Sequence, residues 1–332
     1  FLQVNEEAGH NPLANSVSPH AVKLVDGGLV LEAPVDPAAM IHPDSTRATL
    51  LFANSVSNNN DLNLSTILGG TDDGNLVTLG ATSDVLSTSQ IGGAIRFNPT
   101  AQHRTVTIAG GNKILEFTQG LTQANHVEAL DVQSGTVSLR AAGDYPGQST
   151  IGSGGALFAN HADALGAGDG TEATATIVEQ GGWLYISVED LNPQELVILR
   201  GGGLSGNTPG GVTIVEERSR LYGGQYNGNI TGPGSLLVTQ HPTSSTTTYH
   251  YFNGANTYTG KTYLAAGEFE LNHPQALGDP SAETYLISGV LDVRAALGEP
   301  IHIDGGIMRL HDSQFNGEIT LENLQISNKL LI

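Results

Sequence analysis

Asp72 and Asp73 form an adjacent acidic pair that is a candidate for acid–base chemistry. Glycoside hydrolysis requires two carboxylates held at a fixed separation. Neighbouring side chains on one strand face opposite ways, and the Gly-His-Gly and Arg-x-Lys elements that accompany such a pair in pectin-acting enzymes are missing. The segment 69–75 therefore favours a plain turn, and we expect no catalytic residue.

Two groups of oxygen-bearing side chains are candidates for calcium, namely Asp72/Asp73/Asn75 and Asp169/Glu172, because hard cations take several oxygen ligands. The glycine-rich nonapeptide of calcium-binding β-rolls is absent. The 11 histidines are scattered, with no pair at i, i+2 or i, i+4. We therefore predict no metal and no cofactor, with calcium kept as the alternative.

Three aromatic residues, Tyr249, His250 and Tyr251, lie in the segment 239–252, which reads as a loop or hairpin protruding from a regular scaffold. Protruding loops are where binding usually resides, so this trio is a candidate contact patch. The apolar start, with Phe1, Leu2 and Val4, is a candidate arm that adds a strand to a neighbouring copy.

The composition excludes several classes of function. The 332 residues hold 13 Lys+Arg and 33 Asp+Glu, a net charge of −20, which opposes binding to nucleic acid. There is no cysteine for disulfides, thiol catalysis or Cys-ligated zinc. No run of about 18 apolar residues is present, so we expect no membrane insertion by this segment. The start at Phe1, without an initiating Met, indicates a processed or truncated end.

Short strands separated by turns dominate the pattern. Most apolar stretches alternate every second residue between Gly, Asn, Asp or Ser. A small pattern (Gly, any, apolar, any, apolar) recurs and predicts a unit of about 23 residues. It begins at Gly27, Gly93, Gly135, Gly155, Gly182, Gly234, Gly267, Gly289 and Gly306. A unit of this size with two or three strands predicts an all-β solenoid of stacked coils.

Longer self-matches support the repeat. The segment 220–231 matches 309–320 at seven of twelve positions. The segments 145–151 and 160–166 resemble 258–264 and 272–278, which places His161 and His273 at matching positions before Ala-Leu-Gly and predicts a structural corner. Residues 1–65 are rich in proline and predict an N-terminal cap or pairing arm, followed by the solenoid over residues 66–332.

The segment 254–278, GANTYTGKTYLAAGEFEL followed by ALG, resembles the passenger-associated repeat of bacterial autotransporters. Lys261 replaces a glycine of the family pattern, and Glu268-Phe269 replaces the usual Thr-Leu. The clear resemblance covers about 230–293, with a degenerate copy at 145–187. It implies a right-handed parallel β-helix that is exported to the outside of the cell.

These observations predict a non-catalytic extracellular β-solenoid of a bacterial cell surface, serving as a structural fibre, an adhesin or a matrix component. Its partners would be a host or cell-surface ligand. One alternative is a subunit that stacks end to end into an extracellular filament, because the strand edges at the ends of a rod favour non-closing contacts. Another alternative is a carbohydrate-active parallel β-helix enzyme.

Overall fold

The computed structural model describes residues 114–188, 191–207, 212–240, 247–311 and 315–322 in full. It also describes shorter stretches between residues 91 and 108 and, before residue 91, the backbone of the strands. The chain divides into two compact units, Phe1–Thr176 and Ile177–Ile332.

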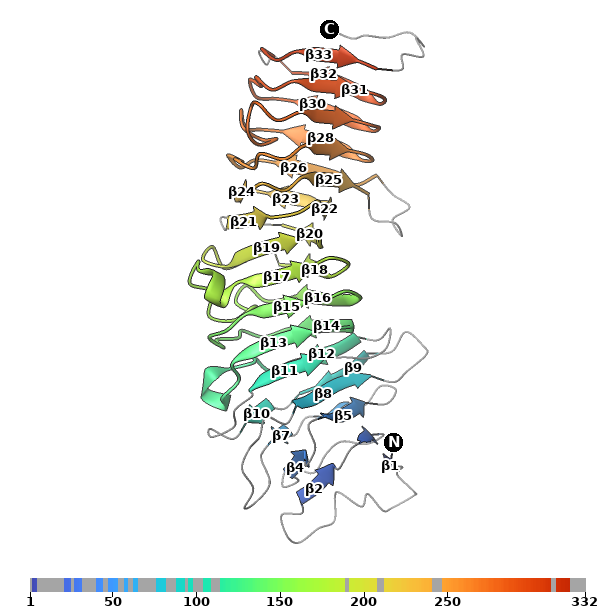
Figure 1. Ribbon diagram of the computed structural model, residues 1–332, viewed down its shortest axis with the longest axis vertical. Coiled ribbons are helices and arrows are strands. Elements are labelled where there is room, and N and C mark those ends of the chain that lie inside the picture. The colour runs from blue at the N-terminus through green and yellow to red at the C-terminus, as the bar shows by residue number, and fades with distance from the viewer. Residues whose placement is uncertain are drawn as a thin grey trace. The chain divides into compact units, whose positions relative to one another are not determined.

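Unit 1 is built from parallel strands that return to the same sheet once per coil (Figure 1). Its first sheet has the order β1 (Leu2–Val4), β3 (Gly27–Leu31), β5 (Arg47–Phe52), β8 (Leu76–Ala81), β11 (Thr105–Ile108), β13 (Ala129–Val132) and β15 (Ser149–Ile151). The second contains β6 (Ser57–Asn58), β9 (Thr88–Ile91), β12 (Ile114–Phe117), β14 (Gly135–Leu139) and β16 (Gly155–Ala159). A third contains β2 (Ala21–Leu24), β4 (Met40–Pro43), β7 (Leu62–Leu64) and β10 (Ile95–Phe97). Two short 3₁₀ turns, η1 (Gln123–Asn125) and η2 (Glu172–Thr174), lie between strands.

Unit 2 follows the same principle with three sheets. One has the order β17 (Thr176–Glu179), β19 (Leu196–Arg200), β21 (Val212–Val215) and β24 (Asn229–Thr231). The second, the long sheet, has the order β18 (Trp183–Ile186), β20 (Gly203–Gly206), β22 (Ser219–Tyr222), β25 (Leu236–Thr239), β27 (Thr262–Leu264), β29 (Thr284–Leu286), β31 (Ile301–Ile303) and β33 (Ile319–Leu321). The third, the short sheet, has the order β23 (Gly224–Tyr226), β26 (Tyr249–Phe252), β28 (Glu268–Leu271), β30 (Val290–Val293) and β32 (Ile307–Leu310).

The prediction of an all-β parallel solenoid is confirmed, with coils of about 20 residues. Coil length is not constant. Gly135 pairs with Gly155, 20 residues further on, whereas Leu196 pairs with Val212, only 16 residues further on. The repeat is therefore somewhat shorter than the 23 residues expected from glycine spacing. The pairing of β5 with β8 is parallel and crosses the boundary expected near residue 65. Whether residues 1–65 cap the solenoid or pair with another copy stays a prediction.

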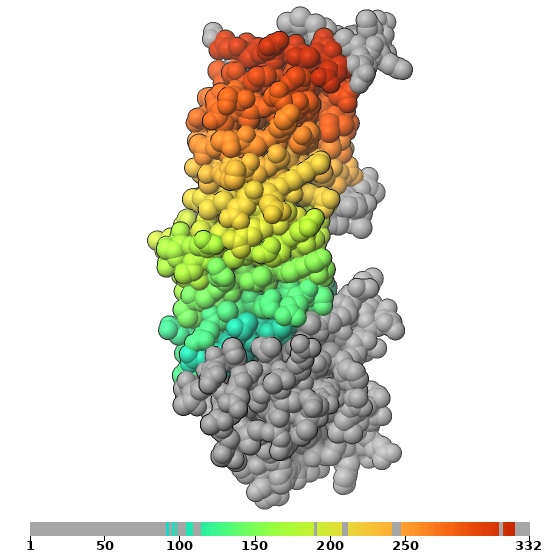
Figure 2. Space-filling model, viewed as in Figure 1, coloured from blue at the N-terminus to red at the C-terminus, as the bar shows by residue number. Residues whose placement is uncertain are grey.

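Each coil contributes aliphatic and aromatic side chains to an interior that only stacking can bury. In the long sheet the inward positions Leu184, Leu204, Leu221, Val238, Leu264 and Leu286 are all buried and lie in register from strand to strand. Burial of such a side chain contributes roughly 1.5–3 kcal/mol. Figure 2 shows the described coils of unit 2 as successive colour bands, as expected when each coil packs mainly on the next.

A tyrosine corner occurs in the described part of each unit and explains the second self-match. In unit 1 the hydroxyl of buried Tyr145 hydrogen-bonds Ser149, whose Oγ donates to the Leu165 carbonyl at 3.4 Å. In unit 2 the hydroxyl of buried Tyr258 lies 2.6 Å from Thr262 Oγ1, which donates to the Leu277 carbonyl at 3.5 Å. The corner is therefore conserved in geometry between the two copies.

Glycine and histidine complete both corners. Gly166 and Gly278 have φ of +104° and +101°, and a Cβ there would lie within 3.1 Å of the tyrosine ring. Only glycine meets both requirements. His161 and His273 each accept a backbone N–H on Nδ1 at 3.1 Å, from Asp163 and Gln275. The two histidines are thus corner residues, as expected from their matching positions.

Asn256 joins three coils of unit 2. Its side chain is fully buried; Oδ1 accepts from the Ile230 N–H at 2.9 Å and Nδ2 donates to the Ala276 carbonyl. Both backbone partners would otherwise be buried polar groups without a bond, which costs free energy.

We predict that Asn256→Ala lowers the free energy of unfolding by about 2–4 kcal/mol, because two buried backbone groups lose their partner. Urea denaturation checks this. The matched control is Asn272→Ala, since the side chain of exposed Asn272 bonds two side chains, those of half-buried Asn253 and Glu270, and no buried backbone group among the described residues. We expect it to cost about 0.5 kcal/mol. Equal losses in the two variants would show that Asn256 does not hold the coils together.

Candidate functional site

One outward-facing column of side chains crosses eight strands of the long sheet in unit 2. Since the inward positions on either side are aliphatic and buried, the intervening residues face outward. Strand pairing places them in register, one per coil, and we name the set the outer column. It consists of Trp183, Gly203, Arg220, Leu237, Tyr263, Tyr285, His302 and Thr320.

Three rings of the outer column stack on one another. The centroids of Tyr263 and Tyr285 are 5.4 Å apart with planes at 18°, and those of Tyr285 and His302 are 4.6 Å apart at 11°. Each such pair adds about 0.5–1.5 kcal/mol beyond area burial. Because the rings cover one another's faces, they present mainly their edges outward.

A charged triad flanks the stack. Lys261 Nζ lies 2.6 Å from Glu283 Oε2 and 3.2 Å from the Tyr285 hydroxyl, which donates to Glu283 at 2.7 Å. The bond to Glu283 raises the pKa of Lys261, and the bond from Lys261 lowers the pKa of Glu283. The lysine charge is therefore balanced locally.

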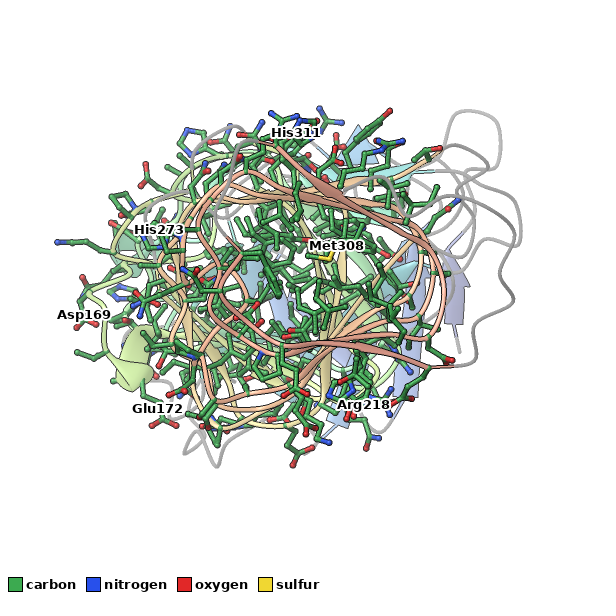
Figure 3. The ribbon with its side chains drawn as sticks, turned by 90° about the horizontal axis from the view of Figure 1, so that it is seen from above. Asp169, Glu172, Arg218, His273, Met308 and His311 are labelled. Carbon is green, nitrogen blue, oxygen red and sulfur yellow. The ribbon has the colours of Figure 1, made fainter. Side chains whose placement is uncertain are left out.

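Arg218 and Arg220 lie on the same exposed face, at and just before β22. The guanidinium carbon of Arg218 is 5.1 Å from the centroid of the Tyr263 ring, a cation–π distance. Arg220 stands in the outer column between Gly203 and Leu237. Within the described ranges, neither arginine pairs with a carboxylate. Figure 3 shows Arg218 projecting outside the coil.

Trp183 extends the aromatic surface at the other end of the outer column. A Cβ at Gly203 would lie 1.8 Å from the Trp183 ring, so the ring rests directly over that glycine. The same ring stacks on Tyr222 at 4.6 Å with planes at 12°. Glycine at residue 203 therefore makes room for this stack.

The short sheet presents a face of different character, on which both arginines are paired with acids. Arg294 lies 2.9 Å from Glu270, and Arg309 and His311 lie 3.7 and 3.6 Å from Asp292. Figure 3 shows His311 on the opposite side of the coil from Arg218. Two arginines are thus present on each face, but those of the short sheet are neutralised by acids.

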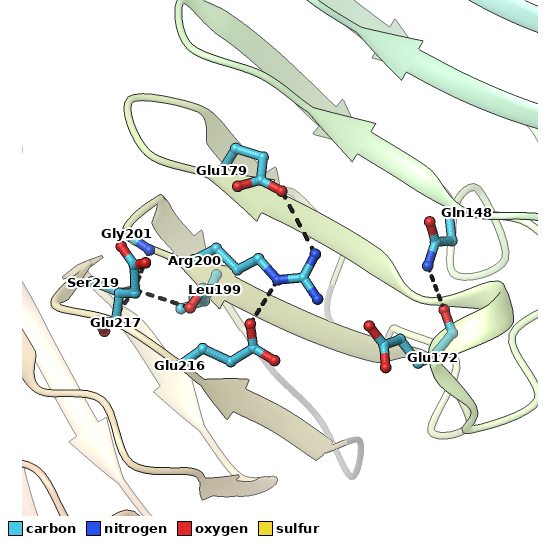
Figure 4. A network of polar contacts seen from close by, with 9 residues as sticks. All are labelled: Gln148, Glu172, Glu179, Leu199, Arg200, Gly201, Glu216, Glu217 and Ser219. Atoms are coloured by element: carbon cyan, nitrogen blue, oxygen red, sulfur yellow. Dashed lines mark hydrogen bonds and ion pairs between the residues drawn. The ribbon is translucent and has the colours of Figure 1, made fainter.

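A similar ladder of charges lies along another sheet of unit 2 (Figure 4). Arg200 Nε is 2.6 Å from Glu216 and its Nη1 is 3.7 Å from Glu179. In unit 1, Gln148 donates to the carbonyl of Glu172 at 2.7 Å. These contacts join residues of different coils.

The placement of Tyr249, His250 and Tyr251 in a protruding loop was wrong. They belong to strand β26, which pairs in parallel with β23 and β28. Tyr249 is 49% exposed and stacks on Tyr251 at 6.3 Å, whereas His250 points inward and is fully buried. The alternation around His250 was itself a strand signal. Residues 241–246 lie outside the described residues.

The other predicted site residues are placed only in part. Phe1, Asp72, Asp73 and Asn75 lie outside the described residues. Leu2 and Val4 belong to β1, the edge strand of its sheet, which pairs with β3 of the same chain. Whether this arm also reaches another copy stays a prediction.

Of the two residues proposed for calcium, Asp169 uses a carboxylate oxygen in a local turn. Asp169 Oδ1 accepts from the Thr171 N–H at 2.8 Å and from the hydroxyls of Thr171 and Thr174 at 2.7 and 2.6 Å. These bonds lower the pKa of Asp169. Across the described ranges, no three His, Cys, Asp or Glu side chains are grouped so that they could hold a metal ion.

Among the buried ionisable side chains of unit 2, His250 and Glu299 have strongly shifted pKa values because of their burial. His250 stacks on Phe269 at 5.0 Å, and a hydrogen bond with the backbone of Ala266 only partly opposes the effect of burial on its pKa. Burial lowers its pKa to about 4. Glu299 is 2% exposed, its Oε1 has no described partner, and burial raises its pKa to about 8.

No protein-family model, curated protein or solved structure matches the chain. None of the described helices is long and apolar enough to cross a membrane. The site must therefore be interpreted from its own geometry.

The outer column was missed at the level of sequence, although its signal is present. Thr262-Tyr-Leu, Thr284-Tyr-Leu and Ile301-His-Ile share the inward–outward–inward pattern of one outer-column position. Aligning strands by this pattern would have found the ring stack. Arg218 gave no such signal, because it contacts the Tyr263 ring although the two residues are not in register in the long sheet.

We predict that acid destabilises the protein through His250. Below pH 6.5 the unfolded chain binds a proton on this ring, whereas the native state does so only near pH 4, so stability falls as the pH falls through that window. By pH 4 the difference is on the order of 3 kcal/mol. His250→Leu should remove this loss, measured by urea denaturation between pH 7.5 and 4.

We predict that Glu299 has the opposite effect on the pH dependence of stability, which Glu299→Gln should remove. Glu299 is protonated in the native state up to about pH 8 but ionises near 4.5 when unfolded, so it costs stability progressively as the pH rises from 4.5 to 8. The glutamine variant should gain stability relative to the parent at pH 8 and not at pH 4. Identical pH profiles for parent and either variant would contradict the assignment for that residue.

Proposed function

We propose that this chain is a non-catalytic extracellular β-solenoid of a bacterial cell surface, serving as a structural fibre, an adhesin or a matrix component. One observation carries the proposal: outward polar and aromatic groups are largely engaged with their equivalents in the next coil. Lys261 with Glu283, Asn253 with Asn227, and Arg200 with Glu216 are examples. Such contacts favour an integral scaffold over a reactive centre.

The resemblance of 254–278 to the passenger-associated repeat supports the extracellular setting. The motif is used here as a structural device: Tyr258 closes the corner and Asn256 bridges the coils. A Cβ at Gly254 or Gly260 would lie about 2 Å from the carbonyl oxygens of Gly228 or Gly234, so both glycines allow close stacking. A chain that relies on such local devices needs no disulfide outside the cell.

Antibodies raised against the purified chain test the location. We expect them to label intact cells of the source bacterium, and added protease to remove that label while a cytoplasmic marker stays intact. Labelling only after the cells are broken open would contradict the extracellular assignment.

Incubation with acidic and neutral polysaccharides tests the non-catalytic assignment. We expect no release of reducing ends or unsaturated products, because the outward carboxylates Glu216, Glu270 and Glu283 are each engaged in an ion pair with a basic residue of a neighbouring coil. Products released by the parent, and not by a variant with Asp72→Asn and Asp73→Asn, would establish the carbohydrate-active alternative.

A second candidate function is end-to-end stacking into a filament, favoured by the surface of β32 and β33. Ile307, Leu310, Ile319 and Leu321 are 53, 39, 42 and 44% exposed, so apolar side chains cluster at the last described strands. Among the described strands, β33 pairs only with β31. An apolar surface beside the edge strand of the described part of the sheet suits addition of a further strand.

We predict that the protein forms elongating rods in a concentration-dependent manner, and that Ile319→Lys combined with Leu321→Lys abolishes them through charge repulsion and loss of apolar contact. Negative-stain microscopy and light scattering would record this. The control is Glu318→Lys, an exposed neighbour that changes charge without removing an apolar side chain. Monodisperse particles of the parent at all concentrations would contradict the filament.

A further inference from the structure

We infer that the outer face around Arg218, Arg220 and Tyr263 binds a carboxylated polysaccharide. The inference names a ligand class for the proposed adhesive or matrix role and rests on that role for its biological setting. The binding itself is a property of the folded chain.

The first argument is charge. The chain carries only 13 basic residues against 33 acidic ones, yet Arg218 and Arg220 stand together on one exposed face. None of the carboxylates in the described coils pairs with them, in contrast to Arg200, Arg294 and Arg309. Two guanidinium groups without an ion pair to a described carboxylate form a local anion site even on an acidic protein, because screening confines the field of distant charges to about 8 Å at physiological salt.

The second argument is orientation. Arg218 lies over the Tyr263 ring, whose other face is covered by Tyr285. The cation–π contact with the ring restricts the guanidinium group, so that less side-chain freedom is lost when a ligand binds. Guanidinium groups held in this way suit bidentate bonding to carboxylates. Tyr263 is thus a positioning residue for Arg218.

The third argument is the shape of the face. Around the arginines lie half-buried Leu237 and the edges of the ring stack, which offer apolar contact to the C–H faces of sugar rings. The outer column repeats once per coil, at about the 4.8 Å spacing of paired strands. A linear polymer can therefore lie along the column and meet an equivalent position in each successive coil.

The charge density of the ligand separates polysaccharide from nucleic acid. Duplex DNA carries about one charge per 1.7 Å, and a net charge of −20 on the protein opposes its approach. A uronate polymer carries at most one carboxylate per sugar, so its charge density along the chain is lower than that of DNA. The acidic protein therefore repels it less for each contact that the polymer makes with an arginine. The observations therefore favour the carboxylated polysaccharide.

The test is binding of the full chain to immobilised polygalacturonate, with dextran as the uncharged polymer and double-stranded DNA as the phosphate polymer. We expect binding to polygalacturonate that weakens as salt is raised, and neither binding to dextran nor stronger binding to DNA. Arg218→Gln combined with Arg220→Gln should weaken it by roughly a hundredfold, about tenfold for each arginine. Arg294→Gln combined with Arg309→Gln removes the same charge from the other face and should leave binding within about twofold.

Variants of Tyr263 distinguish a role in positioning Arg218 from a general loss of structure. Tyr263→Ala should weaken binding, whereas Tyr263→Phe, which keeps a ring under Arg218, should restore it. Thermal unfolding of every variant shows that the fold is intact. No binding to polygalacturonate, equal losses in the two double-arginine variants, or tighter binding to DNA would overturn the inference. These binding results are independent of the surface-labelling and product-release experiments. The failure of this inference can therefore be distinguished from the failure of the proposed function.

Discussion

Parallel pairing of each coil with the next is the constraint on which the whole structure depends. It brings every residue against its equivalent one coil away, at about 4.8 Å. Side chains of similar character at equivalent positions therefore stack on one another. Inward leucines form a continuous interior, and outward tyrosines form a stack from Tyr263 to His302. Because a single coil cannot bury its interior, stability grows with the number of coils stacked.

The same constraint sets the demands at the corners. Where the chain turns between sheets, backbones of successive coils approach so closely that a Cβ at Gly260 would lie 2.1 Å from the Gly234 carbonyl oxygen. Polar groups freed by the turn need partners, which Asn256 and the tyrosine corner supply. Buried His250 and Glu299 are different, since their apolar surroundings disfavour their charged forms. Their opposite effects on pH dependence limit the range in which the stack is most stable.

Much of the fold could be predicted from the sequence because short local patterns specify the strands and turns of each coil. Alternation gave the strands, and the match between Tyr145 and Tyr258 gave a corner that both units build with the same hydrogen bonds. The longer match of 220–231 with 309–320, by contrast, does not correspond to equivalent positions in the structure. It places Arg220 on the long sheet and Arg309 on the short sheet, so similar letters occupy different positions in the coil. The candidate site depends on the position of each residue within its coil. Because the coils differ in length, this position cannot be predicted from the spacing of residues in the sequence. For the same reason, the burial of His250 was missed when its segment was taken for a loop.

Engineered cysteines would test the pairing register most directly, since the chain has no cysteine of its own. Thr136 and Ala156 face each other in β14 and β16, whereas Phe158 lies on the same face two residues further along. Thr136→Cys with Ala156→Cys should cross-link rapidly under mild oxidation, because a disulfide requires Cα atoms within about 7 Å. Thr136→Cys with Phe158→Cys should cross-link far more slowly. Equal rates for the two pairs, or faster reaction of the second, would contradict the stacked-coil account.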